Sequence, residues 1–83
     1  MEIGYKPTFI RQLNALEAGL REEALERIEE FKDSKNHTRL RVHPLKGFYS
    51  FSVDYRHGIV FEWIGKHKSF AALTSIGDHT IYE

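Results

Sequence analysis

The sequence predicts an α+β fold in which an N-terminal strand and a two-helix hairpin precede a three- to four-stranded antiparallel sheet. Two changes of pattern support this class. Between residues 7 and 32, apolar residues recur at three- and four-residue steps, the period of one helical face. From residue 40 onward they alternate with polar residues, the period of a half-buried strand. Consecutive hairpin strands favour an antiparallel sheet with the helices on one of its faces.

The N-terminal third is expected to hold a short strand and both helices. Residues 3–5 can form the strand, and Pro7 or Thr8 can start the first helix, since both suit a first helical turn. Gly19 is expected to cap this helix, because glycine readily adopts the left-handed conformation. A second helix is predicted from about residue 21 to 32. Its expected inner face consists of Ala24, Leu25, Ile28 and Phe31.

The rest of the chain is typical of strands separated by turns. β-branched and aromatic residues are frequent in it, and glycines punctuate it. Five aromatic side chains on the apolar phases are expected in the core: Phe9, Phe31, Phe51, Phe61 and Trp63. The expected order is strand 40–43, strand 49–55, turn 56–58, strand 59–64, turn 65–68 and strand 69–76, which Gly77 ends.

Length and composition indicate one small globular domain, residues 1–83. A chain of 83 residues builds a single modest core. The absence of cysteine excludes a disulfide framework and a thiolate zinc site. The longest apolar run, residues 70–73, is far shorter than the roughly 20 residues of a membrane-spanning helix. Without a basic-then-apolar leader pattern, a soluble cytoplasmic protein that makes no membrane contact is expected.

The charged residues balance overall but are unevenly distributed. Residues 1–33 hold five basic and eight acidic residues, whereas residues 34–83 hold seven basic and four acidic ones. All five histidines also lie in the second segment. A polyanion would therefore be attracted to the C-terminal part, although glutamate-rich helices alone could produce the same division.

The chemistry-bearing residues favour a metal-free reaction over metal or nucleotide chemistry. No histidine pair has the spacing of a helical metal site, and no glycine-rich phosphate loop or GxSxG elbow is present. Neither a metal nor a cofactor is therefore expected. Arg39, Arg41 and His43 are spaced two apart, so in a strand they would share one face. A sheet could bring four further residues to them: Lys46, Arg56, His79 and Tyr82.

This set of residues fits RNA cleavage without a metal. The reaction needs a base for the 2′-hydroxyl, cations for the phosphate and an acid for the leaving oxygen. Histidine suits both proton transfers because it titrates near neutral pH. The alternative interpretation is that these are solvated residues on an exposed sheet face.

Several segments, in the same order along the chain, resemble the RelE/ParE superfamily of bacterial toxins. Residues 40–47, LRVHPLKG, are similar to the family's HxLxG segment. Residues 49–56 and 59–61 resemble its central hairpin, and residues 76–82 resemble its C-terminal G-x-H…Y ending. Residues 29–33 and 36–37 also match the end of the second helix in RelE-like members. The resemblance covers nearly the whole chain and implies the same order of elements as the periodicity.

The resemblance implies a toxin of a type II toxin–antitoxin system. RelE-like members are ribosome-dependent messenger RNA endonucleases that need no metal. By this resemblance His43 and His79 would be base and acid in an unassigned order, and Arg56 would clamp the phosphate. Tyr82 would stack on a base. Lys46, Arg41 and Arg39 would bind substrate. The implied partners are a small antitoxin, messenger RNA and the ribosome, with operator DNA bound through the antitoxin.

One departure from the family pattern leaves two alternatives open. Gly58 stands where RelE-like nucleases commonly carry an arginine, and Arg56 lies two residues earlier. If Arg56 belongs to the turn, the phosphate clamp is missing. The chain could then be a catalytically impaired toxin that mainly binds its antitoxin. A ParE-like inhibitor of DNA gyrase, which cleaves nothing itself, is the other alternative.

Overall fold

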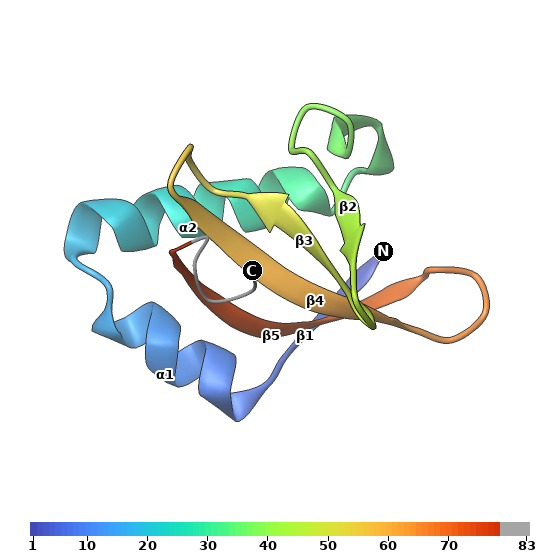
Figure 1. The fold of residues 1–83 in the computed structure, drawn as a ribbon, viewed down its shortest axis with the longest axis horizontal. Coiled ribbons are helices and arrows are strands. Elements are labelled where there is room, and N and C mark those ends of the chain that lie inside the picture. The colour runs from blue at the N-terminus through green and yellow to red at the C-terminus, as the bar shows by residue number, and fades with distance from the viewer. Residues whose placement is uncertain (79–83) are drawn as a thin grey trace.

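The computed structural model describes residues 1–78 and confirms the α+β class (Figure 1). Five strands form one sheet in the order β1-β5-β4-β3-β2. Strands β2 to β5 pair antiparallel with their sequence neighbours, and β1 pairs parallel with β5. The elements in chain order are β1 (Glu2–Tyr5), α1 (Pro7–Ala15), α2 (Ala18–Phe31), the 3-10 helix η1 (Ser34–Asn36), β2 (His43–Leu45), β3 (Phe48–Ser52), β4 (His57–Ile64) and β5 (Phe70–Asp78).

The predicted antiparallel sheet is formed by β2 to β5, and β1 adds to it in parallel, a pairing that the sequence did not predict. Short turns specify the direction of strands that follow each other, but the partner of β1 lies at the far end of the chain. Backbone hydrogen bonds from Glu2 to Ser69 and from Lys6 to Leu73 extend this pairing, each with an N···O distance of 2.9 Å. The strand thus forms one edge of the sheet, and β2 forms the other.

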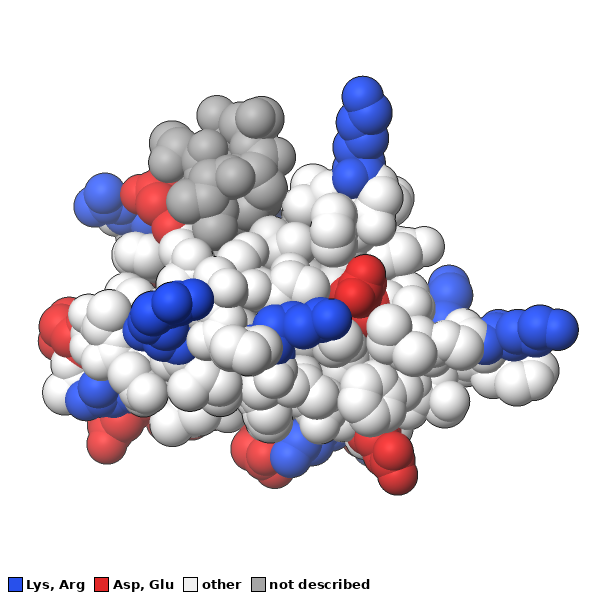
Figure 2. Space-filling model, turned by 90° about the horizontal axis from the view of Figure 1, so that it is seen from below, with Lys and Arg blue, Asp and Glu red and all other residues white. Residues whose placement is uncertain are grey.

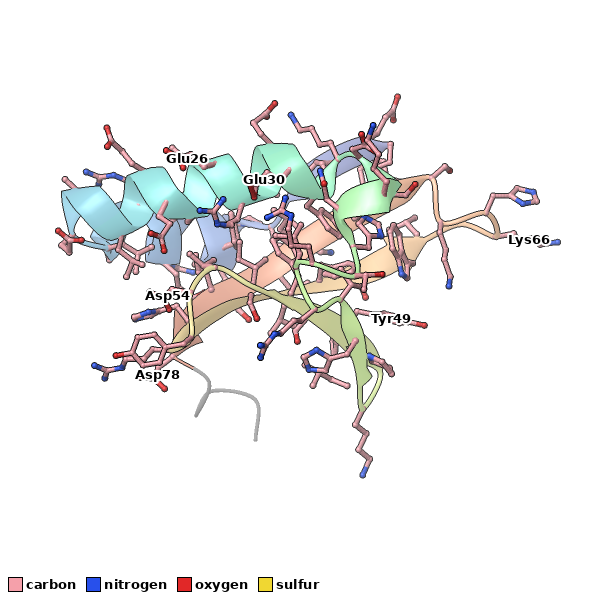
Figure 3. The ribbon with its side chains drawn as sticks, turned by 90° about the horizontal axis from the view of Figure 1, so that it is seen from above. Glu26, Glu30, Tyr49, Asp54, Lys66 and Asp78 are labelled. Carbon is pink, nitrogen blue, oxygen red and sulfur yellow. The ribbon has the colours of Figure 1, made fainter. Side chains whose placement is uncertain are left out.

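Both helices cover the same face of the sheet (Figure 3), and the core lies between the two layers. Helix α1 buries Phe9 and Leu13, and α2 buries Ala24, Ile28 and Phe31. The prediction that Leu25 is buried is wrong, because it lies beside this stripe and is 46% exposed. Of the five predicted core aromatics, Trp63 is only partly buried. The other four are fully buried: Phe9, Phe31, Phe51 and Phe61.

The break between the helices lies before Gly19 and is formed by a carboxylate cap rather than by the predicted glycine cap. Helix α1 ends at Ala15, and Gly19 belongs to the first turn of α2. The Glu17 carboxylate caps α2 by accepting hydrogen bonds from the backbone N–H groups of Gly19 and Leu20. A side-chain acceptor at this position satisfies N–H groups that have no partner within the helix.

Several strand limits differ from the prediction. Residues 40–42 are not a strand, since Arg41 has a positive φ of 59° and only His43–Leu45 form β2. The turn after β3 occupies residues 53–56, so β4 already begins at His57. Strand β5 continues to Asp78, where the prediction ended it at Gly77. The predicted turn at 65–68 is confirmed, with positive φ at Gly65 and Lys68.

Two side-chain contacts fix β5 in place. The Gln12 side chain of α1 accepts a hydrogen bond from the Ile76 backbone N–H at 2.9 Å. A β-bulge in β5 leaves Thr74 without a partner residue on β4, and its hydroxyl donates to the Val60 carbonyl at 3.0 Å. Within residues 1–78, none of the helices is long and apolar enough to cross a membrane.

Candidate functional site

His43 lies on edge strand β2 with its imidazole held at both ring nitrogens. Nδ1 lies 2.7 Å from the Arg41 carbonyl oxygen, and Nε2 lies 3.1 Å from the Ser50 hydroxyl oxygen. The side chain is exposed to solvent. His43 pairs directly with Ser50 of β3, and Ser50 is 1% exposed. The edge of the sheet therefore presents an oriented, accessible histidine.

These contacts select one tautomer of the neutral ring. A carbonyl oxygen only accepts hydrogen bonds, so Nδ1 must carry the proton and donate it to Arg41. Nε2 then carries the lone pair and accepts from the Ser50 hydroxyl. The positive φ of Arg41 brings its carbonyl to the ring. A histidine held in this way can take a proton from a substrate hydroxyl at Nε2.

A pocket of about 650 Å³ opens on the face of the sheet that the helices leave uncovered. It contains Val60 and Ser75, which continue the cross-strand row that begins with His43 and Ser50. Its remaining lining includes Phe48 and an ion pair between Lys6 and Glu62 at 3.7 Å. The histidine and the pocket thus occupy one continuous surface, large enough for a nucleotide-sized ligand.

The predicted common face for Arg39, Arg41 and His43 is not present. Arg39 and Arg41 precede β2 in turns, so the two-residue spacing does not place them on a strand. The Arg39 guanidinium lies 3.4 Å from the Glu30 carboxylate of α2, which also binds Arg27. The hydrogen bond from Arg27, opposed by partial burial, gives Glu30 a lowered pKa, and Arg39 adds to this effect. Arg39 therefore stabilises the junction between this turn and α2.

Arg56 lies away from His43, at the other end of the sheet. It belongs to the turn before β4, and its guanidinium lies 3.6 Å from the Asp78 carboxylate. Counting strands and residues places it about 10 Å across the sheet and about 13 Å along it from His43. Figure 3 shows Asp54 and Asp78 together at this end, opposite Lys66. The expected grouping of Arg56 with His43 is therefore not formed.

The other predicted site residues are distributed as follows. Lys46 is exposed in the turn between β2 and β3, next to Gly47, whose φ is 82°. Gly58 is buried within β4, opposite Ser52 and Gly77, rather than in a turn. His79 and Tyr82 lie outside the described residues. Among the residues that the structure describes, no three histidine or acidic side chains are grouped to hold a metal ion.

Charged side chains of both signs are interspersed on the face of the molecule that Figure 2 shows. Figure 2 shows lysine and arginine alternating with aspartate and glutamate, with wide uncharged areas between them. Five of the eight ion pairs within the described residues join side chains at most three positions apart. Attraction of a polyanion would therefore depend on local groups beside a site rather than on a global field.

Asp54 organises the turn between β3 and β4. Its Oδ1 accepts hydrogen bonds from the backbone N–H of Arg56 at 2.8 Å and of His57 at 2.7 Å, and from His57 Nδ1 at 3.0 Å. Burial raises the pKa of this carboxyl, but the three hydrogen bonds outweigh it, so the pKa lies below its ordinary value. His57 is consequently half-buried against Asp54.

Replacing Asp54 with asparagine is expected to destabilise the fold at pH 7 by about 1–2 kcal/mol, because charge-assisted hydrogen bonds become neutral ones. Folding lowers the pKa of Asp54, so its ionised carboxylate stabilises the fold fully at pH values above the unfolded-state pKa of about 4. This stabilisation is lost as the pH falls through the lower pKa of the folded state. Urea unfolding at pH 7 and pH 3 measures the difference. Glu22→Gln, at an exposed carboxylate, is the control. An Asp54→Asn penalty of equal size at both pH values would contradict this assignment.

Ser50 is the site residue that the sequence did not reveal. It occupies a polar position in the alternating pattern of residues 49–55, yet it is 1% exposed. Its pairing with His43 depends on the β2–β3 register, which no local pattern specifies. The sequence offered one signal: Ser50 carries a hydroxyl and lies on the strand that follows His43 after the turn at Gly47.

Comparisons with solved structures agree on one fold. The chain is similar to the Escherichia coli RelBE toxin–antitoxin complex (14% identity, TM-score 0.70, covering 93% of this chain and 94% of that chain). It is also similar to the RelBE2 complex of Mycobacterium tuberculosis, with 15% identity and a TM-score of 0.73, covering 94% of this chain and 96% of that chain. The YoeB/ParE toxin of Agrobacterium tumefaciens is similar as well, with 16% identity and a TM-score of 0.65, covering 95% of this chain and 99% of that chain. No protein-family model and no curated protein sequence matches the chain.

These similarities extend over nearly the whole length of both chains, and at such low identity they establish the fold. The element order also agrees with the order that the sequence resemblance implied: a strand, two helices and a sheet built from the remaining strands. The chain has the fold of the RelE/ParE toxin superfamily.

Proposed function

We propose that this chain is the toxin of a type II toxin–antitoxin pair and cleaves messenger RNA on the ribosome without a metal. The fold shared with toxins such as RelBE and YoeB/ParE supports the class. The observation that carries the nuclease proposal is His43, an exposed imidazole whose two hydrogen bonds leave the lone pair on Nε2. A toxin that acts only by binding has no need of an oriented proton acceptor.

In the proposed reaction, His43 Nε2 removes the proton from a ribose 2′-hydroxyl. The resulting oxygen attacks the adjacent phosphorus, and the bond to the 5′-oxygen of the next nucleotide breaks. That oxygen takes a proton from an acid, for which His79 is the candidate, and a 2′,3′-cyclic phosphate remains. The substrate hydroxyl replaces the Ser50 hydroxyl at Nε2. Lys46 and Arg41 are the proposed phosphate-binding residues near His43, and Tyr82 is the proposed stacking residue.

Ser50 is proposed as a positioning residue for His43. The Ser50 hydroxyl holds the ring in this orientation until the substrate hydroxyl takes its place. Replacing Ser50 with alanine leaves the free ring unheld at Nε2 and is expected to lower the cleavage rate roughly fivefold to tenfold, the value of one hydrogen bond. Ser50→Thr keeps the hydroxyl and should recover most of the rate. Single-turnover cleavage and urea unfolding are measured on both variants. An equal loss of rate in both, or a loss explained by unfolding alone, would contradict the positioning role.

A second candidate function is antitoxin binding by a catalytically impaired toxin. Two observations favour it. The Arg56 guanidinium is engaged with Asp78 at the far end of the sheet from His43. The position where RelE-like nucleases commonly carry an arginine is Gly58, which is buried and has no side chain to bind a phosphate. Within residues 1–78 the proposed phosphate-binding residues are Lys46 and Arg41 alone, so stabilisation of the transition-state charge would be weak.

An antitoxin is the proposed partner in both cases. Ile10 of α1 is 40% exposed and Leu25 of α2 is 46% exposed, so each helix presents an apolar side chain to solvent. Within residues 1–78, strands β1 and β2 leave the two edges of the sheet open to an added strand. A segment that combines a helix with an extended strand could cover both features. Operator DNA would be bound through such an antitoxin.

The test is cleavage of a defined messenger RNA by the purified protein, with and without programmed ribosomes. Cuts that require ribosomes and leave 2′,3′-cyclic phosphate ends would support the nuclease. Growth arrest with intact messenger RNA would overturn it in favour of gyrase inhibition, which a DNA supercoiling assay would detect. Neither cleavage nor growth arrest, together with binding to the product of an adjacent small gene, would favour the impaired toxin.

A further inference from the structure

A second pocket, of about 460 Å³, lies where the end of α2, helix η1 and the β4–β5 turn meet. Its lining includes Lys32, His37, Trp63, His67, Lys68 and Ser69. Trp63 shares the helix-facing side of β4 with Phe61, whereas Ser50 and its partner Val60 lie on the other side. The pocket is therefore separate from the His43 surface.

One wall of this pocket is aromatic and firmly supported. The His37 and Trp63 rings have centroids 6.2 Å apart, and both pack against the buried Phe31, at 4.8 Å and 6.0 Å. His37 is also fixed by a 2.9 Å hydrogen bond between Nε2 and the Phe31 carbonyl oxygen. Among residues 1–78, the Trp63 indole N–H has no hydrogen-bond partner. A partly exposed ring held in place in this way offers a flat surface and a free donor to a planar ligand.

The opposite side of the pocket is cationic. Among its described lining residues there is no carboxylate, whereas two lysines and two histidines are present. Lys32 is engaged with Glu29, but within residues 1–78 Lys68 has no acidic partner. The Lys68 ammonium lies 6.0 Å from the centre of the Tyr49 ring, which keeps it at this end of the sheet. An anionic group would therefore find an ammonium without an acidic partner at Lys68, and would share Lys32 with Glu29.

We propose that this pocket binds a nucleotide unit, with the base stacked on Trp63 and His37 and the phosphate held by Lys68 and Lys32. A planar aromatic group joined to a phosphate is the ligand chemistry that satisfies both walls at once. The unit can belong to a free nucleotide or to a single-stranded RNA. The proposal does not depend on RNA cleavage, because binding is measured without ribosomes.

The experiment uses the chain's single tryptophan as its reporter. Titration with 5′-AMP is expected to quench Trp63 fluorescence to saturation, whereas adenosine binds at least roughly fivefold more weakly because it lacks the phosphate. Lys68→Gln should weaken 5′-AMP binding roughly fivefold. Lys66→Gln, on the same turn but outside the pocket, is the matched control and should leave binding within about twofold. Trp63→Leu, followed by calorimetry, should weaken binding roughly tenfold.

Three results would overturn the proposal: no saturable quenching by 5′-AMP up to about 5 mM, equal binding of adenosine and 5′-AMP, or equal effects of Lys68→Gln and Lys66→Gln. Circular dichroism verifies that each variant is folded. A single-stranded tetra-adenylate that binds more tightly than 5′-AMP would identify RNA as the source of the unit, and weaker binding would identify a free nucleotide. Lys68→Gln is expected to leave messenger RNA cleavage unchanged, so the two proposals fail separately.

Discussion

Replacing His43 with alanine is expected to reduce ribosome-dependent cleavage by about 10²- to 10⁴-fold, the usual contribution of a positioned general base. The effect should fall on the chemical step, because the ring is exposed at the edge of the sheet and does not pack in the core. Single-turnover cleavage on programmed ribosomes, at saturating protein, measures that step directly. Binding to the ribosome is expected to change little.

The controls distinguish a lost base from a damaged fold. Exposure of His43 means that its removal opens a space that solvent imidazole can enter, so added imidazole should restore part of the rate. His67→Ala removes another exposed histidine, in the β4–β5 turn, and should leave cleavage unchanged. A His43→Ala protein that cleaves at the wild-type rate would overturn the general-base role of His43. So would a loss of activity that the loss of folded structure fully explains, without rescue by imidazole.

Much of the fold follows from local patterns because the information lies within each element. The period of the apolar residues identified both helices, and β-branched and aromatic residues identified β4. The predictions failed at the helix break and at residues 40–42. Glu17 caps the start of α2, whereas Gly19 was expected to end the first helix. Residues 40–42 alternate like a strand, but Leu40 packs into the core from a turn.

The candidate site was less predictable than the fold, for a physical reason. Its geometry depends on which residues face each other across strands, and sequence spacing does not fix that register. His43 was identified, but its partner Ser50 was not, because the pair forms only in the β2–β3 register. Arg56 was grouped with His43 by residue type. The turn that Asp54 stabilises places it instead at the other end of the sheet.

The largest effect on stability is expected from replacing Phe31 with alanine, at about 3–5 kcal/mol. Phe31 is fully buried at the end of α2, and its ring stacks on Phe51 with centroids 4.3 Å apart and planes at 10°. It also meets Phe61 edge-on at 4.8 Å. Removing the ring leaves a cavity at the point where α2, β3 and β4 converge, and rigid strands cannot collapse into it.

A loss of that size is comparable with the whole stability of a domain of this length, about 4–12 kcal/mol, so Phe31→Ala should be largely unfolded at 37 °C. Urea unfolding followed by circular dichroism measures it. Phe31→Leu retains most of the volume and should lower the free energy of unfolding by less than about 2 kcal/mol. Tyr55→Ala, at a side chain that is 88% exposed, should lower it by less than about 0.5 kcal/mol.

Because His37 and Trp63 pack against Phe31, Phe31→Leu should also weaken 5′-AMP binding while the protein remains folded. If Phe31→Ala lost no more stability than Tyr55→Ala, this ring would not be the centre of the core, and the aromatic wall would lack its support.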